Sequence, residues 1–281
     1  MDNPRRSIAR PQFIELNGRR LFTMQMLPTG PVRASALYLP PFAEEMNRCR
    51  VSVAGQARAL AARGWHVMLL DAYGTGESTG RIEDGDWALW RDDAQAAAQW
   101  LAQHSGHVPM LWGIRTGALL AADAVAQGLQ QVQHLLLQQP VLDGKLFINQ
   151  HLRLRIASQL VHDTVRETTE GIRQRLAAGE DIEIAGYPLT GRMAEGLSAR
   201  RLADWTAALA PRRIDWLEIV SNAEQGLALP SQKLVDQLRQ AGATVNTATV
   251  ACPMIWQLQE PADASALLQA SLALLGEAGD A

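Results

Sequence analysis

The sequence of 281 residues predicts an α/β protein with a mostly parallel sheet. This class is predicted because short apolar runs that end near Gly, Pro or Asp alternate with longer segments of helical spacing, and 47% of the residues are apolar. This apolar content can bury a sizeable core, which excludes disorder as the main state. Because strands and helices alternate, we expect crossover connections and a parallel sheet with helices on both faces.

The first expected element is a β-hairpin at residues 13–27. Apolar and polar residues alternate there on both sides of Asn17-Gly18, a dipeptide that suits a tight two-residue turn. Short apolar runs then predict buried strands at 34–42, 65–74, 108–117, 134–144, 215–222 and 244–253. Between them, apolar residues at helical spacing predict one helix from Val51 through Ala54, Ala57 and Ala61, and another from Trp87 to Leu101.

The alternation stops between Lys145 and Pro211. Three segments in this interval have helical character, and a short extended piece lies among them: 147–160, 168–179 and 194–205 for the helices and 180–189 for the extended piece. Strand and helix alternate again from residue 215, with helices expected near 231–242 and 267–279. We therefore expect one sheet domain made of residues 1–144 and 212–281, with residues 145–211 as a helical cap inserted after the sixth strand.

Composition excludes several classes of function. The formal net charge of -3 gives no overall basic field for nucleic acid or an anionic membrane. Two cysteines, Cys49 and Cys252, are too few for a disulfide scaffold or a four-cysteine zinc site, and they suit a reducing cytosol. The first residues lack the apolar core of a signal peptide, and no apolar run is long enough to span a bilayer. These features predict a soluble, cytoplasmic protein.

Residues 109–125 have the frame of a nucleophile elbow. An apolar strand ends at Gly113, a second glycine follows at Gly117, and a helix begins at once. Glycines make room where a sharp turn brings the backbone against its neighbours. Arg115 stands at the centre of the motif, where Gly-x-Ser-x-Gly places its serine. A guanidinium stays protonated and has no lone pair for attack, so Arg115 cannot be the nucleophile.

Two further loops point to the same fold. The sequence DAYGTGESTG after the strand at 65–70 matches an Asp-x-x-Gly-x-Gly-x-Ser loop common in α/β-hydrolases of the serine-aminopeptidase-like group. We expect Asp71 and Ser78 to tie this loop by hydrogen bonds. After the strand at 34–39, Pro40 and Pro41 stand where these enzymes usually have His-Gly and an oxyanion-hole amide. Proline has no N–H, so the amide of Phe42 or Ala43 would have to serve instead.

The general base is also missing from its usual place. In this fold the base comes from the loop after the last strand, which here is ACPMIWQLQEP and contains no histidine. The six histidines all precede residue 163: His66, His104, His107, His134, His151 and His162. Glu224 is only a loose match for the acid that would orient a base. The sequence therefore predicts a degenerate catalytic site.

Five segments in combination indicate a family. They are PPFAEEMN at 40–47, DAYGTGESTG at 71–80, GIRTGALLAA at 113–122, QQPVLDGK at 138–145 and PMIW at 253–256. Over nearly the whole chain they resemble the proteins named exosortase A system-associated hydrolase 2. The resemblance implies an α/β-hydrolase fold in a Gram-negative bacterium, and a link to exopolysaccharide production and the sorting of PEP-CTERM proteins. Members resemble one another in having arginine at the elbow, so no catalytic residue is carried over.

Arg115 is the centre of the expected ligand site. The N-terminus of the following helix already favours an anion, and a guanidinium there could hold the carboxylate or phosphate of a small anionic or acyl ligand. Alternatively, Glu44 or Glu45 could pair with Arg115, since a buried charge needs a partner. Thr116 could supply a hydroxyl, although we expect it to cap the helix. The candidate ligand-binding residues are thus Arg115, Thr116, Glu44, Glu45 and Phe42.

Other chemistry has less support in the sequence. Cys252 could be a displaced nucleophile, but a small buried apolar role is favoured. His104 and His107 have no evident third ligand, so we expect no metal ion and no cofactor. We predict a binding or accessory protein that has a small-molecule ligand or a protein partner of the exopolysaccharide or exosortase system. The alternatives are a hydrolase or acyl transferase that uses Cys252, or a water activated by Glu44 or Glu45, and a purely structural module that binds a partner.

Overall fold

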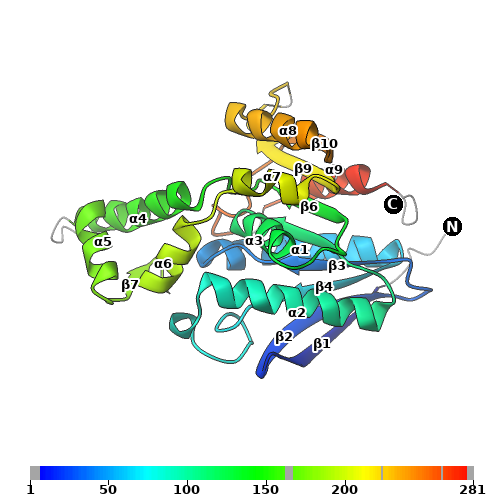
Figure 1. Ribbon diagram of the computed structural model, residues 1–281, viewed down its shortest axis with the longest axis horizontal. Helices are drawn as coiled ribbons and strands as arrows, with labels where there is room; N and C mark the ends of the chain where they lie inside the picture. The colour runs from blue at the N-terminus through cyan, green and yellow to red at the C-terminus, as the bar shows by residue number, and fades with distance from the viewer. Residues whose placement is uncertain (1–6, 162–166, 223, 261, 277–281) are drawn as a thin grey trace.

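The computed structural model describes residues 7–161, 167–222, 224–260 and 262–276, with side chains in all but the end of one helix at 158–161. Within these ranges an eight-stranded sheet forms the centre of the molecule, in the order β1-β2-β4-β3-β5-β6-β9-β10 (Figure 1). From β4 to β10 the neighbouring strands are parallel. The predicted α/β class is confirmed.

The chain opens with an antiparallel hairpin of β1 (Ser7–Leu16) and β2 (Arg19–Pro28). Its turn uses Asn17 and Gly18, both with positive φ, as the sequence predicted. The hairpin begins at Ser7, six residues before the predicted start. The prediction missed residues 7–12 because they are mostly exposed and so show no alternation of buried and exposed positions. β2 then pairs antiparallel with β4 and joins the hairpin to the sheet.

Six parallel strands form the rest of the sheet. They are β3 (Ala34–Leu39), β4 (Trp65–Leu70), β5 (Met110–Ile114), β6 (His134–Gln138), β9 (Arg213–Val220) and β10 (Thr244–Ala251). β3 lies between β4 and β5, so the turns that follow β3 and β5 are neighbours at the carboxyl edge of the sheet. This arrangement brings the predicted elbow beside the segment that contains Glu44 and Glu45.

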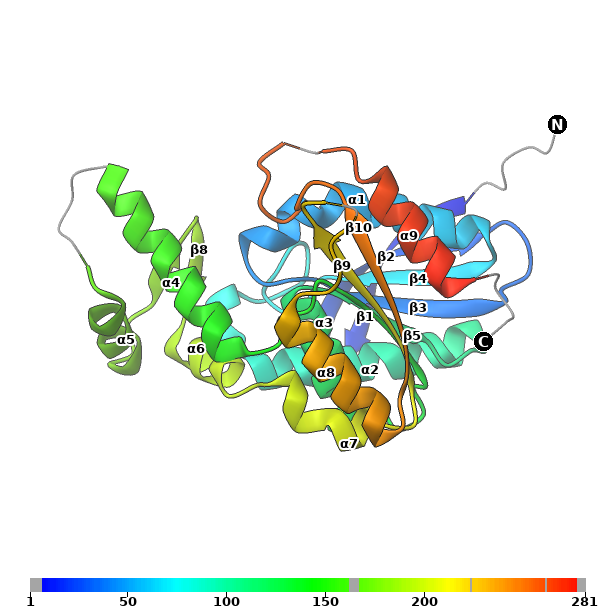
Figure 2. The same cartoon turned by 90° about the horizontal axis from the view of Figure 1, so that it is seen from above.

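Helices cover both faces of the sheet (Figure 2). On one face α1 (Glu44–Ala62) and α9 (Ser265–Leu275) share a hydrophobic cluster with Trp112 of β5. On the other face α2 (Trp87–Ser105), α3 (Thr116–Ala126) and α8 (Leu229–Ala241) pack with Leu37 of β3. The predicted tryptophan stripe of α2 is buried: Trp87 and Trp90 are both at most 4% exposed.

The stripe predicted for the first helix is partly wrong. Val51 is 60% exposed, whereas Cys49, Val53 and Leu60 are buried. The helix begins at Glu44, seven residues before Val51, because the polar sequence EEMNRCR forms its first two turns. The actual buried face therefore includes a cysteine and a methionine, Met46, that lie in a segment with little apolar periodicity.

The interval between β6 and β9 is mainly helical. It contains α4 (Gly144–Val161), α5 (Thr169–Ala177), α6 (Gly191–Ser198), the 3-10 turn η2 (Leu202–Trp205), α7 (Thr206–Leu209) and the hairpin β7 (Ile182–Ile184) and β8 (Tyr187–Leu189). The helix expected at 194–205 is thus divided into α6 and η2, with an isolated bridge between Asp143 and Arg201 at the break. In Figures 1 and 2, α4, α5 and α6 extend beyond one end of the sheet.

This interval shares its core with the sheet domain. Phe147, Ile148 and Leu197 belong to the same hydrophobic cluster as Trp87 and Leu119. Arg200 also forms an ion pair of 3.3 Å with Asp123 of α3. These contacts hold the inserted segment against α2 and α3. None of the helices described is long and apolar enough to cross a membrane.

Candidate ligand site at the elbow

The turn between β5 and α3 is a sharp elbow with Arg115 at its tip. Arg115 has φ 56° and ψ -120°, a region that residues with a side chain rarely adopt. Its backbone N–H donates to the Gln138 carbonyl at 3.0 Å, and its carbonyl accepts from the Val141 N–H at 3.2 Å. Both partners lie in residues 138–141 at the end of β6, and this segment therefore fixes the unusual conformation.

The two glycines of the motif are sterically required. A Cβ on Gly113 would lie 2.3 Å from the Gly117 carbonyl oxygen, and a Cβ on Gly117 would lie 2.1 Å from the Leu39 carbonyl oxygen. Both neighbours are backbone atoms, which cannot rotate away as a flexible side chain can. The close approach predicted from the sequence is present on both sides of Arg115.

The guanidinium of Arg115 pairs with Glu45 from the first turn of α1. Nη2 donates to Glu45 Oε1 at 3.2 Å, and Nε lies 3.3 Å from both carboxylate oxygens. Only 18% of the Arg115 side chain and 13% of the Glu45 side chain are exposed. Burial raises the pKa of the Glu45 carboxyl, and the positive charge of Arg115 offsets only part of that rise. Of the two carboxylates that the sequence offered, Glu45 is the partner.

Two aromatic rings lie beside this ion pair. The Cζ atom of Arg115 is 5.0 Å from the ring centre of Trp256 and 6.0 Å from that of Phe147. Trp256 comes from the loop after β10, where the fold usually places its catalytic histidine. Arg48 anchors this loop by donating to the carbonyls of Trp256 and Gln257 at 3.4 and 3.1 Å. The loop after β10 thus brings a buried indole beside Arg115.

A hydrogen bond joins Thr116 and Phe42. The Phe42 N–H donates to Thr116 Oγ1 at 2.7 Å, and both residues are buried. This amide was one of two that could have served an oxyanion, and it already has an acceptor. The expectation that Thr116 caps α3 is wrong, because Arg115 occupies the N-cap position and no side chain caps this helix.

Glu44 lies beside Glu45 in the sequence but not beside Arg115. Its side chain is buried, and its Oε2 atom has no hydrogen-bond partner among the described residues. Burial raises the pKa of its carboxyl, with only a weaker opposing influence from a backbone hydrogen bond and Arg48. Consecutive helical residues point about 100° apart, so one register of α1 directs only one of the two carboxylates toward Arg115.

The loop after β4 is tied as the sequence predicted. Ser78 Oγ donates to the Asp71 carbonyl at 2.6 Å and accepts from the Phe22 N–H at 2.8 Å. The Asp71 carboxylate accepts from the Glu77 N–H at 3.0 Å and pairs with Arg50 at 3.3 Å. These bonds fix the loop against β2, which assigns both residues a structural role.

Cys252 and Glu224 are the other candidate catalytic groups. Burial raises the pKa of the half-buried Cys252 thiol, which opposes formation of a thiolate. Glu224 lies exposed in the loop after β9. No group of three or more residues able to hold a metal ion occurs in the part of the chain that is described.

Two of the buried polar residues were not singled out as site residues from the sequence, Glu218 and His151. Glu218 in β9 accepts from the Trp216 indole at 3.1 Å and from the Ala228 N–H at 3.0 Å, and only its position inside an apolar run could have marked it. His151 of α4 is 4% exposed, and its Nε2 has no hydrogen-bond partner among the described residues. The spacing of Phe147 and His151, one helical turn apart on an apolar face, was the available signal for the second.

His151 lies close to the elbow through aromatic contacts. Its ring stacks on Phe147 with a centroid distance of 5.8 Å and meets the edge of Phe42 at 5.6 Å. Burial lowers its pKa to about 4, so the imidazole is neutral at pH 7. The inserted segment therefore places a neutral imidazole beside Phe42.

A cavity of about 300 Å³ lies next to this site. Its walls include Ala43 and Asn47 from the turn into α1, Trp90 from α2 and Tyr187 from β8. Arg115 is not among the described residues that line it. The space near the elbow is thus displaced from the guanidinium toward the β7-β8 hairpin.

The sheet order, the strand-turn-helix elbow and the loop after the last strand define an α/β-hydrolase fold. Residues 34–180 match the family described as serine aminopeptidase, S33. This match spans more than half of the chain, and the protein belongs to that family. No curated protein sequence matches the chain.

Solved structures agree on the fold. The chain is similar to Est1E from Butyrivibrio proteoclasticus in a complex with ferulic acid, with a TM-score of 0.68 and 14% identity over 94% of this chain and 97% of that one. It is also similar to TT1662 from Thermus thermophilus, with a TM-score of 0.58 and 16% identity over 98% and 99% of the two chains. At such identities the similarity establishes the α/β-hydrolase fold alone.

Proposed function

We propose that this protein is a non-catalytic member of its family that works as a ligand-binding or accessory protein. The observation that supports this most is the elbow itself, where Arg115 replaces the nucleophile and is held by Glu45 beside Trp256. A serine hydrolase needs a nucleophile within hydrogen-bond reach of an oriented base. Here an ion pair and an indole stand in those two places.

The ligand that suits this site is a small anionic or acyl molecule. A carboxylate or phosphate would compete with Glu45 for the Arg115 guanidinium, whose Nη1 makes no hydrogen bond to the described residues. Thr116, Phe42 and Glu44 are the neighbouring candidates for contact. Binding would exchange an internal ion pair for one with the ligand, which limits the gain in affinity.

Residues 145–211 would serve as the cap over this site. Phe147 lies against Arg115, His151 meets Phe42, and the Tyr187 hydroxyl is hydrogen-bonded to the Asn47 amide. All three contacts join the inserted segment to the turns at the carboxyl edge of the sheet. They support the division into a core of residues 1–144 and 212–281 and a cap of residues 145–211.

The proposed setting is the cytoplasm of a Gram-negative bacterium, with a protein partner in the exopolysaccharide or exosortase system. This part rests on the sequence resemblance given above. Co-purification of the chain with proteins encoded near it would support the setting, and its recovery without any such partner would oppose it.

The decisive measurement for the proposed function is hydrolysis of short p-nitrophenyl esters. We expect the folded protein to be no faster than a heat-denatured control. Arg115→Ser should also create no activity, because the elbow alone supplies no base. A rate well above the control that Cys252→Ala or Glu45→Gln abolishes would contradict the proposal and establish an enzyme with a non-standard nucleophile or an activated water.

A further inference from the structure

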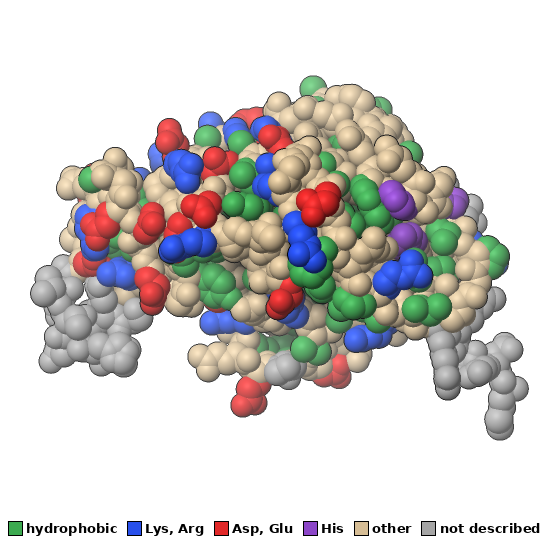
Figure 3. Space-filling view, turned by 90° about the horizontal axis from the view of Figure 1, so that it is seen from below, with side chains coloured by type: hydrophobic (Ala, Val, Ile, Leu, Met, Phe, Trp, Pro, Cys, Tyr) green, Lys and Arg blue, Asp and Glu red, His purple; other side chains and the backbone are tan. Residues whose placement is uncertain are grey.

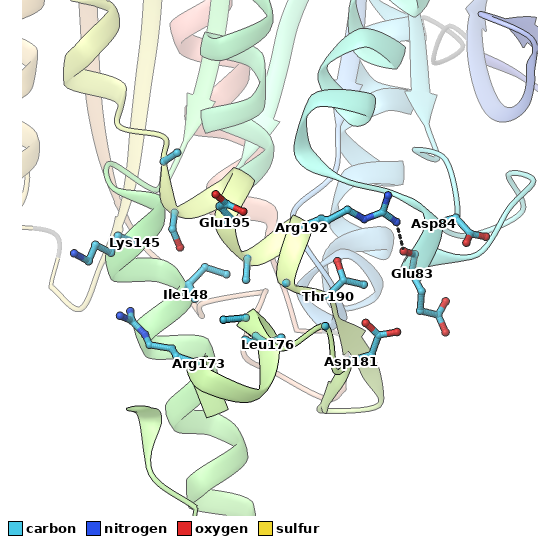
Figure 4. A pocket seen from close by; sticks show the side chains of 16 residues that line it. Glu83, Asp84, Lys145, Ile148, Arg173, Leu176, Asp181, Thr190, Arg192 and Glu195 are labelled. Carbon is cyan, nitrogen blue, oxygen red and sulfur yellow. Dashed lines mark hydrogen bonds between the residues drawn. The ribbon is translucent and has the colours of Figure 1, made fainter. Parts of the chain in front are cut away.

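A second and larger cavity lies in the inserted segment, away from the elbow. It has a volume of about 1070 Å³ and is bounded by α4, α5, α6 and the 3-10 turn η1 (Ile82–Asp84) (Figure 4). Its described lining includes none of Arg115, Glu45, Phe42 and Trp256. This volume slightly exceeds the range of about 300–1,000 Å³ that is typical of small-molecule sites.

Seven charged residues line this cavity, namely Glu83, Asp84, Asp181, Glu195, Lys145, Arg173 and Arg192. Figure 4 shows Lys145 of α4 and Arg173 of α5 on one side, and Asp84 of η1 and Asp181, which precedes β7, on the other. Figure 3 shows basic and acidic side chains interspersed over the end of the molecule that these elements form. Glu195 of α6 lies on the side of Lys145, and Arg192 lies on the side of Asp84, so the separation of charge is partial and the seven formal charges sum to -1.

These charged groups do not neutralise one another. None of Lys145, Arg173, Asp84 and Asp181 is in an ion pair within 4.0 Å among the described residues. Arg192 lies on the acidic side, but it donates to the Glu83 carbonyl at 3.1 Å rather than to a carboxylate. Arg173 donates to the Asn149 side-chain carbonyl, which leaves its charge without a carboxylate partner. Opposite charges that line one cavity without pairing can both be satisfied by one ligand that has an ammonium group and a carboxylate.

The floor between the charged walls is apolar and contains no ring. Ile148, Leu176 and Ala194 form this part, and no aromatic side chain occurs among the described lining residues. Nucleobases are commonly held by stacking on aromatic side chains, so this lining does not favour them. An aliphatic chain fits such a floor better.

We propose that this cavity binds a linear zwitterion, whose ammonium group meets Asp84 and Asp181 and whose carboxylate meets Lys145 and Arg173. Short peptides with free ends and ω-amino acids both have this chemistry. The site is independent of the proposed role of Arg115, so either assignment can fail without the other.

Isothermal titration of the full chain with unblocked alanine peptides of increasing length tests the proposal. We expect binding that strengthens until the two ends reach both walls and that weakens as salt is raised. Acetylation of the N-terminus or amidation of the C-terminus should each weaken binding about three- to fivefold, as expected for partly exposed charge pairs. An ω-amino acid of matching length shows whether the peptide groups contribute.

Two variants assign the ends of the ligand. Asp181→Asn should weaken binding of the free peptide but not of the acetylated one. Lys145→Gln should weaken binding of the free peptide but not of the amidated one. Arg153→Gln is the matched control, because Arg153 lies exposed on α4 and does not line the cavity. Equal binding of free and doubly blocked peptides, or no binding of any zwitterion at millimolar concentration, would overturn the proposal.

Discussion

Two neighbouring turns at the carboxyl edge of the sheet have nearly the same backbone but different side chains. Ala43, between β3 and α1, has φ 56° and ψ -134°, and Arg115, between β5 and α3, has φ 56° and ψ -120°. The first turn presents a methyl group, and the second a guanidinium with a carboxylate and two rings around it. The comparison teaches that the elbow geometry belongs to the fold, while the chemistry depends on which side chain stands at the tip.

Among changes to these two turns, the largest loss of stability should come from a substitution of Gly117, which follows Arg115 in the elbow. Gly117→Ala places a Cβ 2.1 Å from the Leu39 carbonyl oxygen and so forces the two turns apart. We expect a loss of more than about 4 kcal/mol in the free energy of unfolding, or failure to fold. Denaturant unfolding followed by circular dichroism measures it.

Gly55→Ala is the control for that variant. Gly55 lies in α1 with no atom within 4 Å of an added Cβ, so alanine should stabilise the helix by about 0.5–1 kcal/mol. If Gly117→Ala were as well tolerated as Gly55→Ala, the two turns would not be in the tight contact described.

The next largest change in stability is expected at His151, which packs against Phe42, the residue before Ala43. Its pKa is lowered from 6.5 to about 4 in the folded protein, because burial disfavours the charged imidazole. The folded state therefore binds this proton less tightly than the unfolded state does. Its stabilising contribution is complete above pH 6.5 and is lost progressively as the pH falls toward 4, by up to about 3 kcal/mol.

A pH series of denaturant unfolding with the wild type and His151→Phe checks this expectation. The phenylalanine variant keeps an aromatic ring but cannot be protonated, so its stability should fall less between pH 6.5 and 4. Parallel curves for the two proteins would show that His151 is not the group responsible.

Removing the carboxylate from the Arg115 turn should have an intermediate effect. Glu45→Ala leaves a mostly buried guanidinium without its partner, and we expect a loss of about 2 kcal/mol, less than for a fully buried pair because both side chains keep some exposure. The double variant Glu45→Ala with Arg115→Ala should lose less than the sum of the two single variants. Additive losses would mean that the pair contributes no mutual stabilisation.

The smallest effect is expected at the methyl group of the first turn. Ala43→Gly removes the side chain that makes a positive φ unfavourable, but it also increases the freedom of the unfolded chain. The two effects nearly cancel, so the change in melting temperature should correspond to less than about 1 kcal/mol. A larger loss would indicate that the buried methyl group contributes more than the strain costs.

The fold was largely predictable because its signals are local. The apolar runs, the Asn17-Gly18 turn and the spacing of Gly113 and Gly117 each specify a short piece of backbone, and the parallel sheet follows from their order. The choice between Glu44 and Glu45 was not predictable, because it depends on the register of a helix that begins seven residues before the predicted one. A shift of one residue turns a helical side chain by about 100°.

The contacts near the elbow that were not predicted depend on packing between segments far apart in the sequence. His151 was counted among histidines far from the loop that normally supplies the base, and only the folding of α4 against Phe42 brings it near the elbow. Trp256 was noticed as part of a resemblance but not as the residue that lies beside Arg115. Neither contact follows from spacing along the chain, because each joins segments more than a hundred residues apart.

The hydrogen bond from the Phe42 amide to the Thr116 hydroxyl sets a condition for protein engineering. A designer who wished to install ester hydrolysis would need a serine at position 115 and a histidine near position 256. These two changes would still leave the Phe42 amide engaged by an internal hydroxyl. Alanine or glycine at position 116 would release that amide for a substrate oxyanion, so a design that uses the Phe42 amide requires at least three coordinated substitutions.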